Sequence, residues 1–297
     1  MPKVFAVGPP RTATTWMHRV LAGRVNLPRI KETRFFDRRY LKGFDWYRRH
    51  FIPLVEGLPI AEIAPTYFYS GPARQRIFKT IPEAKVIITL RDPVERLYSL
   101  YKLKVSDGTI RMPFERAVRR HPELIESNRY YVHVSGWISQ FGNERVLVML
   151  HDELVKNPQA YLARVCEFIG VSCFAIPESL QQRRSNSSND SRSPTSAWLS
   201  ALAVRAAESF QANNYKRTLA AIRKIGLRRL VLKDKPIALP PLDADLAEAL
   251  RVEMNQELES LEVLLGSDLS MWKAKRLTLH GGTHADRSVG STLELAP

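Results

Sequence analysis

Cysteine is scarce in this sequence, and long hydrophobic runs are absent from it. Cys166 and Cys173 are the only two cysteines among 297 residues, which argues against a disulfide framework and suggests a reducing compartment. No apolar run approaches the roughly 20 residues that a helix needs to cross a bilayer. The opening MPKVFAVGPP has too short an apolar stretch for a signal peptide. We therefore expect a cytoplasmic protein without a transmembrane segment.

Acidic residues are too few to balance the basic ones. The 45 Lys and Arg residues outnumber the 30 Asp and Glu residues, so the formal net charge is +15. This excess indicates an anionic partner, but charge alone does not distinguish a nucleotide from an acidic glycan, a nucleic acid or a membrane surface. A hydrophobic content of 44% and a charged content of 25% exclude a disordered or fibrous chain.

Strand-like and helix-like segments alternate over the first half of the chain. β-Branched and aromatic runs predict strands at residues 3–7, 27–30, 59–63, 85–90 and 145–150. Helical apolar spacing predicts helices between them, for example at 14–22, 71–80 and 93–104. This order predicts the α/β class, with a P-loop-containing parallel sheet of about five strands flanked by helices. Ligands of such sheets bind at the carboxyl ends of the strands.

The second half of the chain is predicted to be mostly helical. Apolar spacing indicates helices at 157–169 and 245–265, whereas 181–196 is rich in Ser, Asn and Arg and predicts a loop. Residues 276–297 are expected to form a disordered tail, since they contain many Gly, Ser and Thr residues. We therefore expect a single domain over residues 1–275 with a helical C-terminal part.

The loop GPPRTATTW connects the first predicted strand to the first predicted helix. Gly8 and Thr15 match the outer positions of the phosphate-binding pattern G-x-x-x-x-G-K-[ST], but Ala13 replaces its second glycine and Thr14 its lysine. The N–H groups at a helix N-terminus still form an anion cradle, and Arg11 adds a fork of donors suited to a phosphate or sulfonate. The alternative is an ordinary turn between a strand and a helix.

A second anion site is predicted where the strand at 85–90 ends in RDPVERLYSLY. Asp92 fits a helix N-cap, and Glu95 three residues later completes a capping box. Arg91 then lies beside the helix start, and Ser99 follows about two turns later, roughly 10 Å along the axis. A phosphate against this helix could contact both. Two alternatives are that Asp92 holds Mg²⁺ as in a nucleotide-triphosphate site, and that Ser99 bonds back to a carbonyl.

A charged pair, Lys31 and Glu32, follows the predicted strand at 27–30 and precedes two phenylalanines. Glu32 can serve as a base, because Lys31 and Arg11 favour its ionised form. The same cations can stabilise negative charge that develops on a phosphate oxygen. The alternative is a surface ion pair without function.

These three segments together resemble motifs of sulfotransferases. GPPRTATTW is similar to the 5'-phosphosulfate loop P-[KR]-[ST]-[GA]-T-T-W, with Ala13 as a mild departure. RDPVERLYSLY resembles the 3'-phosphate segment of the heparan-sulfate group and its bacterial relatives, and KETRFF resembles their K-E-x-x-F-F element. EIAPTYF is similar to E-K-[ST]-P-x-Y-[FL], with Ile63 in place of the lysine. The resemblance spans about residues 3–273 and implies a sulfotransferase domain over 1–275.

The resemblance implies which residues bind the donor, 3'-phosphoadenylyl sulfate. Its 5'-phosphosulfate is assigned to Arg11, Thr12, Ala13, Thr14 and Thr15, its adenine to Trp16, and its 3'-phosphate to Arg91 and Ser99. The segment around Arg183 and Arg184 occupies the place of the basic loop that closes over the nucleotide, which makes these two weaker candidates.

The resemblance also implies a reaction. We expect direct in-line transfer of the sulfuryl group to a hydroxyl or amine, with Glu32 as base and Lys31 and Arg11 as catalytic cations. Adenosine 3',5'-bisphosphate is the expected product, and no metal is required. The expected acceptor is a glycan, glycolipid or small metabolite and not a nucleic acid; contact with a membrane surface and the oligomeric state stay open. The alternatives are a small-molecule kinase, which Thr14 argues against, and a non-catalytic module that binds anionic surfaces.

Overall fold

A four-stranded parallel sheet forms the centre of the computed structural model, which describes residues 1–181, 192–194, 232–236 and 239–274. The strand order is β2-β1-β3-β4. The strands are β1 (Val4–Ala6), β2 (Ala61–Ile63), β3 (Lys85–Leu90) and β4 (Val146–Leu150). In register, Val4 lies opposite Ala61 on one side and Lys85 on the other. Because all four strands run in the same direction, the loops that follow them meet at one edge of the sheet.

The strand predicted at 27–30 does not form, so that prediction was wrong. Asn26 makes only an isolated parallel bridge with Ile60, next to β2. Pro28 has no N–H to donate to a ladder, and the Arg29 N–H bonds to the His50 carbonyl at 2.7 Å. The direction of the chain is nevertheless that of a strand beside β2, so the segment after residue 30 arrives at the carboxyl edge of the sheet.

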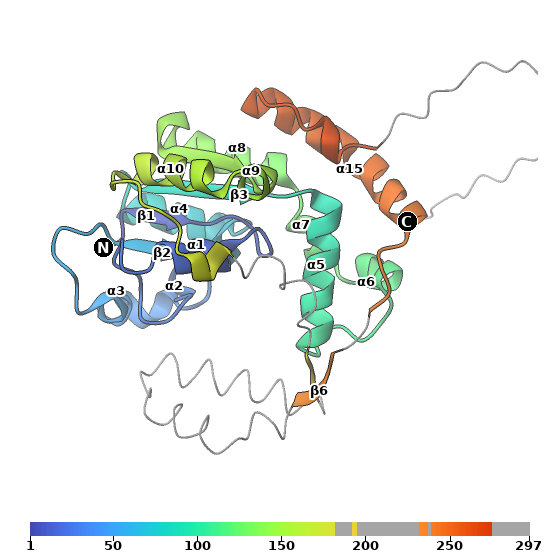
Figure 1. Cartoon of the computed structure of the whole chain (residues 1–297), viewed down its shortest axis with the longest axis horizontal. Coiled ribbons are helices and arrows are strands. Elements are labelled where there is room, and N and C mark those ends of the chain that lie inside the picture. The colour runs from blue at the N-terminus through green and yellow to red at the C-terminus, as the bar shows by residue number, and fades with distance from the viewer. Residues whose placement is uncertain (182–191, 195–231, 237–238, 275–297) are drawn as a thin grey trace, which may run out of the picture.

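Helices cover both faces of the sheet and extend beyond it (Figure 1). In the first half they are α1 (Thr14–Val20), α2 (Phe35–Arg38), η1 (Tyr40–Lys42), α3 (Gly43–Arg48), η2 (Arg49–Phe51), η3 (Pro65–Tyr67), α4 (Gly71–Thr80), α5 (Pro93–Ser106), α6 (Phe114–Arg120) and α7 (Pro122–Glu126). They continue with α8 (Tyr130–Phe141), η4 (Asn143–Arg145), α9 (His151–Lys156), α10 (Pro158–Ile169), α11 (Glu178–Gln181), α15 (Ala244–Leu265) and η6 (Ser270–Trp272). A separate antiparallel pair joins β5 (Arg192–Pro194) to β6 (Leu232–Pro236).

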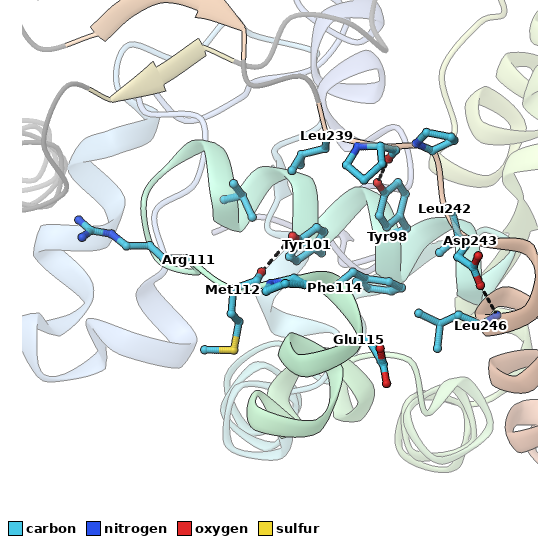
Figure 2. A pocket seen from close by; sticks show the side chains of 14 residues that line it. Tyr98, Tyr101, Arg111, Met112, Phe114, Glu115, Leu239, Leu242, Asp243 and Leu246 are labelled. Carbon is cyan, nitrogen blue, oxygen red and sulfur yellow. Dashed lines mark hydrogen bonds between the residues drawn. The ribbon is translucent and has the colours of Figure 1, made fainter.

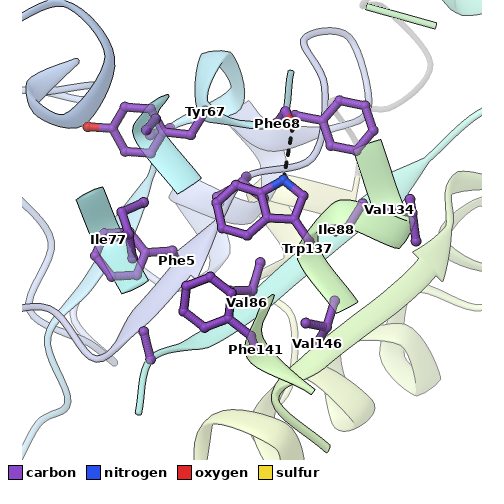
Figure 3. Packing of buried hydrophobic residues seen from close by; sticks show 14 of the residues in the cluster. Phe5, Tyr67, Phe68, Ile77, Val86, Ile88, Val134, Trp137, Phe141 and Val146 are labelled. Carbon is purple, nitrogen blue, oxygen red and sulfur yellow. Dashed lines mark hydrogen bonds between the residues drawn. The ribbon is translucent and has the colours of Figure 1, made fainter. Parts of the chain in front are cut away.

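Alternation along the strands divides the core between the two faces of the sheet. Phe5 and Val86 point to one face, where α2, α3, α4, α8 and α15 pack. Trp137 of α8 lies in the middle of this cluster and donates its indole N–H to the Phe68 carbonyl at 3.0 Å (Figure 3). Val4 and Ile87 point to the other face, which α1, α9 and α10 cover. Each face therefore has its own apolar cluster, as expected for a parallel sheet.

The predicted C-terminal helix is confirmed as α15. Asp243 caps its N-terminus by accepting from the Leu246 N–H at 2.9 Å, and Gly266 ends it in the left-handed region at φ 59°. Arg251 of α15 reaches the Asp92 carboxylate at 3.1 Å, at the start of α5. Helix α15 therefore contacts α5 and supports the element that carries the second predicted anion site.

Candidate active site

The loop between β1 and α1, residues 7–13, has the backbone geometry of an anion cradle and is called the phosphate loop below, after the pattern that its sequence resembles. Gly8 passes so close to β3 that an added Cβ would lie 2.6 Å from the Thr89 nitrogen, so no side chain fits there. Arg11 and Ala13 adopt left-handed conformations at φ 78° and 63°, which turn the chain sharply before α1. The first helical bond of α1 joins the Met17 N–H to the Ala13 carbonyl at 3.0 Å. The N–H groups of the three preceding residues therefore face out of the helix start.

The two predicted anion sites come together in space. Arg11 Nε donates to Ser99 Oγ at 2.8 Å, although 88 residues separate them. Desolvation lowers the pKa of the Arg11 guanidinium, and the nearby charge of Arg91 lowers it further. Lys102, one turn after Ser99, has its pKa lowered by burial and then by the charges of Arg11 and Arg91. Three cations thus converge on one small region, and a bound anion would relieve their mutual repulsion.

Arg91 keeps part of its donor capacity free. One terminal nitrogen bonds to Glu95 Oε2 at 2.9 Å, while Nε is buried and has no hydrogen-bond partner in the described part of the chain. A buried donor without a partner is costly, and an anion at this point would satisfy it. The predicted capping box does not close as expected, because the Glu95 carboxylate turns to Arg91.

Asp92 acts as the N-cap that the sequence predicts. Its Oδ1 accepts from the N–H groups of Val94 and Glu95 at 2.9 Å each, and its Oδ2 pairs with Arg251. Both oxygens of this carboxylate are therefore engaged by the protein. The cap interpretation is confirmed, and the alternative of a magnesium ligand loses its support. Within the described residues, no group of three or more His, Cys, Asp or Glu side chains is arranged to hold a metal ion.

Arg96 is a structural residue of the site that sequence reasoning missed. Its guanidinium is 0% exposed and reaches the Pro10 carbonyl in the phosphate loop at 3.2 Å. It also donates to Asn128 Oδ1 at 2.6 Å and to Ser127 Oγ at 2.7 Å. Arg96 therefore fixes the phosphate loop to α5 and to the segment before α8. The sequence does contain a signal, because an arginine among apolar neighbours in a buried helix needs buried acceptors.

Lys31 and Glu32 lie beside the phosphate loop, as predicted from their position after an extended segment. Lys31 Nζ donates to Thr15 Oγ1 at 2.8 Å and lies 3.8 Å from Glu32 Oε1. The other Glu32 oxygen lies 3.9 Å from Arg34 Nε, a cation that sequence reasoning did not assign. The Glu32 side chain is 22% exposed, so solvent or a substrate can reach it. The carboxylate is thus flanked by two cations next to the anion cradle.

The other residues predicted to bind 3'-phosphoadenylyl sulfate differ in what the structure shows of them. Thr12 is buried and donates its hydroxyl to the Pro9 carbonyl at 2.7 Å, so its side chain shapes the loop. Trp16 is half-buried, with its ring edge-on to Tyr161 at 5.8 Å, and its contact with adenine stays a prediction. Arg183 and Arg184 lie outside the described residues. So do residues 276–297, so the tail also stays a prediction.

An apolar pocket of about 620 Å³ lies against α5, and Ser99 is not among the residues that line it (Figure 2). The α5 residues Tyr98, Tyr101 and Val105 form one wall, since their spacing places them on one face of the helix. Phe114 and Leu239 contribute to the rest of the lining. The Tyr101 hydroxyl donates to the Met112 carbonyl at 3.0 Å, so the phenol does not point a free donor into the pocket. Lys102 Nζ lies 5.1 Å from the centre of the Tyr98 ring, so this wall of the pocket adjoins the charged side chains of α5.

Comparisons with known proteins identify the family of this chain. The model of the sulfotransferase domain family matches residues 1–214. A mouse protein, heparan sulfate glucosamine 3-O-sulfotransferase 3A1, is 32% identical over 149 residues, covering 47% of this chain and 38% of that protein. Mouse bifunctional heparan sulfate N-deacetylase/N-sulfotransferase 4 is 28% identical over 197 residues, covering 58% of this chain and 22% of that protein. The chain thus spans well under half the length of these curated relatives.

A solved structure is similar to almost the whole chain. The crystal structure of a sulfotransferase from Alicyclobacillus acidocaldarius superposes with a TM-score of 0.67 at 21% sequence identity. The match covers 92% of this chain and 98% of that one. At this identity the likeness concerns the fold, and it confirms the parallel α/β architecture. The helices of the described residues include none long and apolar enough to cross a membrane.

Proposed function

This chain belongs to the sulfotransferase domain family, and from that premise we propose that it transfers a sulfuryl group from 3'-phosphoadenylyl sulfate to an acceptor hydroxyl or amine. The observation that carries the proposal is the convergence of Arg11, Ser99 and Arg91 at the open end of α1. A nucleotide with phosphate groups on both its 5' and 3' oxygens presents two anions at a fixed separation. Two adjacent anion sites on one sheet edge suit such a molecule.

The donor is held by the residues predicted for it. The α1 N-terminus with Arg11 takes the 5'-phosphosulfate, and Arg91 with Ser99 takes the 3'-phosphate. The bond from Arg11 to Ser99 opens when the donor binds, since both groups then turn to phosphate oxygens. Lys102 adds a third positive charge, and its pKa is lowered by burial and by the charges of Arg11 and Arg91. The positive potential of this region also attracts a polyanionic donor from a distance.

Transfer takes place in one in-line step. The acceptor oxygen or nitrogen forms a bond to sulfur while the bond from sulfur to the 5'-phosphate oxygen breaks. Glu32 takes the acceptor proton, and the departing phosphate oxygen keeps the electron pair. Lys31 lies between Thr15 and Glu32, where it stabilises that developing charge. The product is adenosine 3',5'-bisphosphate.

The acceptor we propose is a glycan. Support comes from the two mouse relatives, whose names refer to heparan sulfate and glucosamine. A glycolipid or a small metabolite fits the same chemistry, because the partly exposed Glu32 requires only a hydroxyl or amine at its carboxylate. The cytoplasmic location of the protein stays a prediction.

The proposal is tested by incubating the full chain with radiolabelled 3'-phosphoadenylyl sulfate and a panel of glycan, glycolipid and small-molecule acceptors. We expect Glu32→Gln to lower kcat by about 10²–10⁴-fold, the usual contribution of a general base, while affinity for adenosine 3',5'-bisphosphate stays the same. Glu144→Gln is the matched control, because Glu144 is an exposed residue paired with Arg145 away from the site. Near wild-type turnover by Glu32→Gln would remove Glu32 as the base. A chain that neither binds the bisphosphate nor labels any acceptor would not have this function.

A further inference from the structure

A buried carboxyl group lies directly behind the segment that carries Glu32. Glu62, the middle residue of β2, is 0% exposed. Its Oε1 accepts from the Thr33 hydroxyl at 2.5 Å, from the Thr33 N–H at 3.3 Å and from the Tyr67 hydroxyl at 3.2 Å. Its Oε2 accepts from the Tyr47 hydroxyl at 2.5 Å. Four hydrogen bonds from neutral donors thus converge on one buried carboxylate.

These bonds fix the backbone immediately after Glu32. Thr33 adjoins Glu32 in sequence, and its N–H and hydroxyl both bond to Glu62. The Thr33 hydroxyl accepts in turn from the Phe35 N–H at 3.1 Å, and the Tyr67 hydroxyl accepts from the Phe36 N–H at 3.2 Å. The first turn of α2 is therefore satisfied by the same network. Because Arg34 adopts a left-handed conformation at φ 51°, the chain reverses between Glu32 and α2 and depends on these contacts to keep that geometry.

We propose that Glu62 is a positioning residue for the transfer reaction: its ionised carboxylate anchors Thr33 and thereby holds Glu32 beside the phosphate loop. The inference rests on the proposed role of Glu32 as base. Glu62 itself touches neither substrate nor reacting atoms, since it is fully enclosed by β2, α3, η3 and the segment before α2.

The charge state of Glu62 decides whether the anchor is complete. Burial raises the pKa of Glu62 to about 7, although hydrogen bonds from Thr33, Tyr47 and Tyr67 oppose that rise. The two tyrosines face it from α3 and η3, and burial together with the Glu62 charge raises the pKa of both phenols, so they stay donors. Asp37 of α2 also raises the pKa of Tyr67. When Glu62 takes up a proton, one oxygen must donate. The Thr33 N–H can only donate, so the protonated carboxyl group anchors Thr33 less firmly.

The test is steady-state kinetics of Glu62→Gln with saturating acceptor. The amide is similar in shape and has no charge, so this variant resembles the protonated state. We expect kcat to fall about 10- to 100-fold, the usual cost of a misplaced catalytic group, with KM for the donor and affinity for adenosine 3',5'-bisphosphate unchanged. In the wild type, kcat should fall as the pH drops below about 7, the value to which burial raises the pKa of Glu62. In Glu62→Gln that acid limb should disappear. A purely structural role would lower the melting temperature without removing the limb.

Variants of Thr33 keep the proposal testable if Glu62→Gln folds poorly. Thr33→Val preserves the shape and removes the hydroxyl that Glu62 binds, so it should lower kcat in the same way. Thr33→Ser keeps the hydroxyl and should recover wild-type kcat. Wild-type kcat in both Glu62→Gln and Thr33→Val, measured beside an inactive Glu32→Gln, would overturn the positioning role and leave the proposed function intact. Full activity of Glu32→Gln would instead show that Glu32 is not the base, on which both the proposed mechanism and the positioning role of Glu62 rest.

Discussion

The two functional segments of this protein are supported by two buried side chains of opposite charge. Arg96 bonds to Pro10 of the phosphate loop, whereas Glu62 bonds to Thr33 in the segment that carries Glu32. Both supports are 0% exposed. A guanidinium stays protonated at any pH at which proteins are folded, but a buried carboxyl group can gain or lose its proton in the neutral range. The phosphate loop therefore has a permanently charged support, and the segment that carries Glu32 has one that titrates.

Removing the permanent support should have the largest effect on stability. Arg96→Met leaves the Pro10 carbonyl and the Asn128 and Ser127 side chains without their buried donor. Losing charge-assisted bonds of this kind costs about 3–5 kcal/mol of unfolding free energy in total. Urea denaturation measures the loss.

The matched control for this prediction is Arg119→Met. Arg119 is 77% exposed and, within the described part of the chain, pairs with Glu115 one turn away, a contact that contributes little to stability. The control should stay within about 0.5 kcal/mol of the wild type. If Arg96→Met were as stable as Arg119→Met, Arg96 would not be a support of the loop.

Because Glu62 titrates, we expect the free energy of unfolding to depend on pH. The folded pKa of Glu62 is about 7 and its ordinary value is 4.5, so the folded state binds more protons between these two values. Its contribution to stability is complete below about pH 4.5 and is lost as the pH rises through about 7, a total of about 3 kcal/mol. Stability and activity thus have opposite pH dependence, since the ionised form is the one that anchors Thr33.

The measurement is the unfolding free energy of the wild type minus that of Glu62→Gln across this pH range. The difference should shrink as the pH rises, because the amide of the variant has no proton to lose. The same subtraction with Arg119→Met should give a line that does not change with pH. A constant difference for Glu62→Gln would mean that this carboxyl group does not titrate in the folded state.

Affinity for adenosine 3',5'-bisphosphate tests whether Arg91, at the start of α5, binds the nucleotide. Arg91→Ala should weaken binding of adenosine 3',5'-bisphosphate about 10- to 100-fold, because a charge-assisted bond to phosphate is lost. Arg91→Lys should fall in between, since lysine keeps the charge and loses the fork. Isothermal calorimetry gives both values, and Arg119→Ala serves as control. Unchanged affinity in Arg91→Ala would show that Arg91, at the start of α5, does not bind the nucleotide.

The elements with strong local patterns were predictable from the sequence. The strand at 85–90 and the helix at 71–80 have the expected bounds, and Asp92 is the expected cap. The strand at 27–30 failed because Pro28 prevents a ladder there and only Asn26 bridges to β2. The local sequence pattern thus predicts a strand correctly unless the segment cannot form hydrogen bonds with a neighbouring strand.

Contacts between distant segments account for what the sequence could not predict. Arg96 reaches Pro10 across 86 residues, and Arg11 reaches Ser99 across 88. Motifs identified Arg11 and Ser99 separately as anion-binding residues, but no spacing indicates that they touch. Glu62 shows the same limit, because its partners come from three segments that meet only in the folded chain.

The smallest predicted effect concerns Lys102, which lies near both Arg11 and Arg91 and which no sequence motif identifies. We expect Lys102→Ala to weaken binding of adenosine 3',5'-bisphosphate about threefold, or roughly 0.6 kcal/mol, since a partly exposed charge near a phosphate is screened by solvent. Lys104→Ala, on the opposite side of the same helix, should leave affinity unchanged. The decrease should also vanish at high salt, where screening suppresses the attraction. Equal affinities for the two lysine variants at low salt would exclude Lys102 from the donor site and leave Arg11 and Arg91 as its cations.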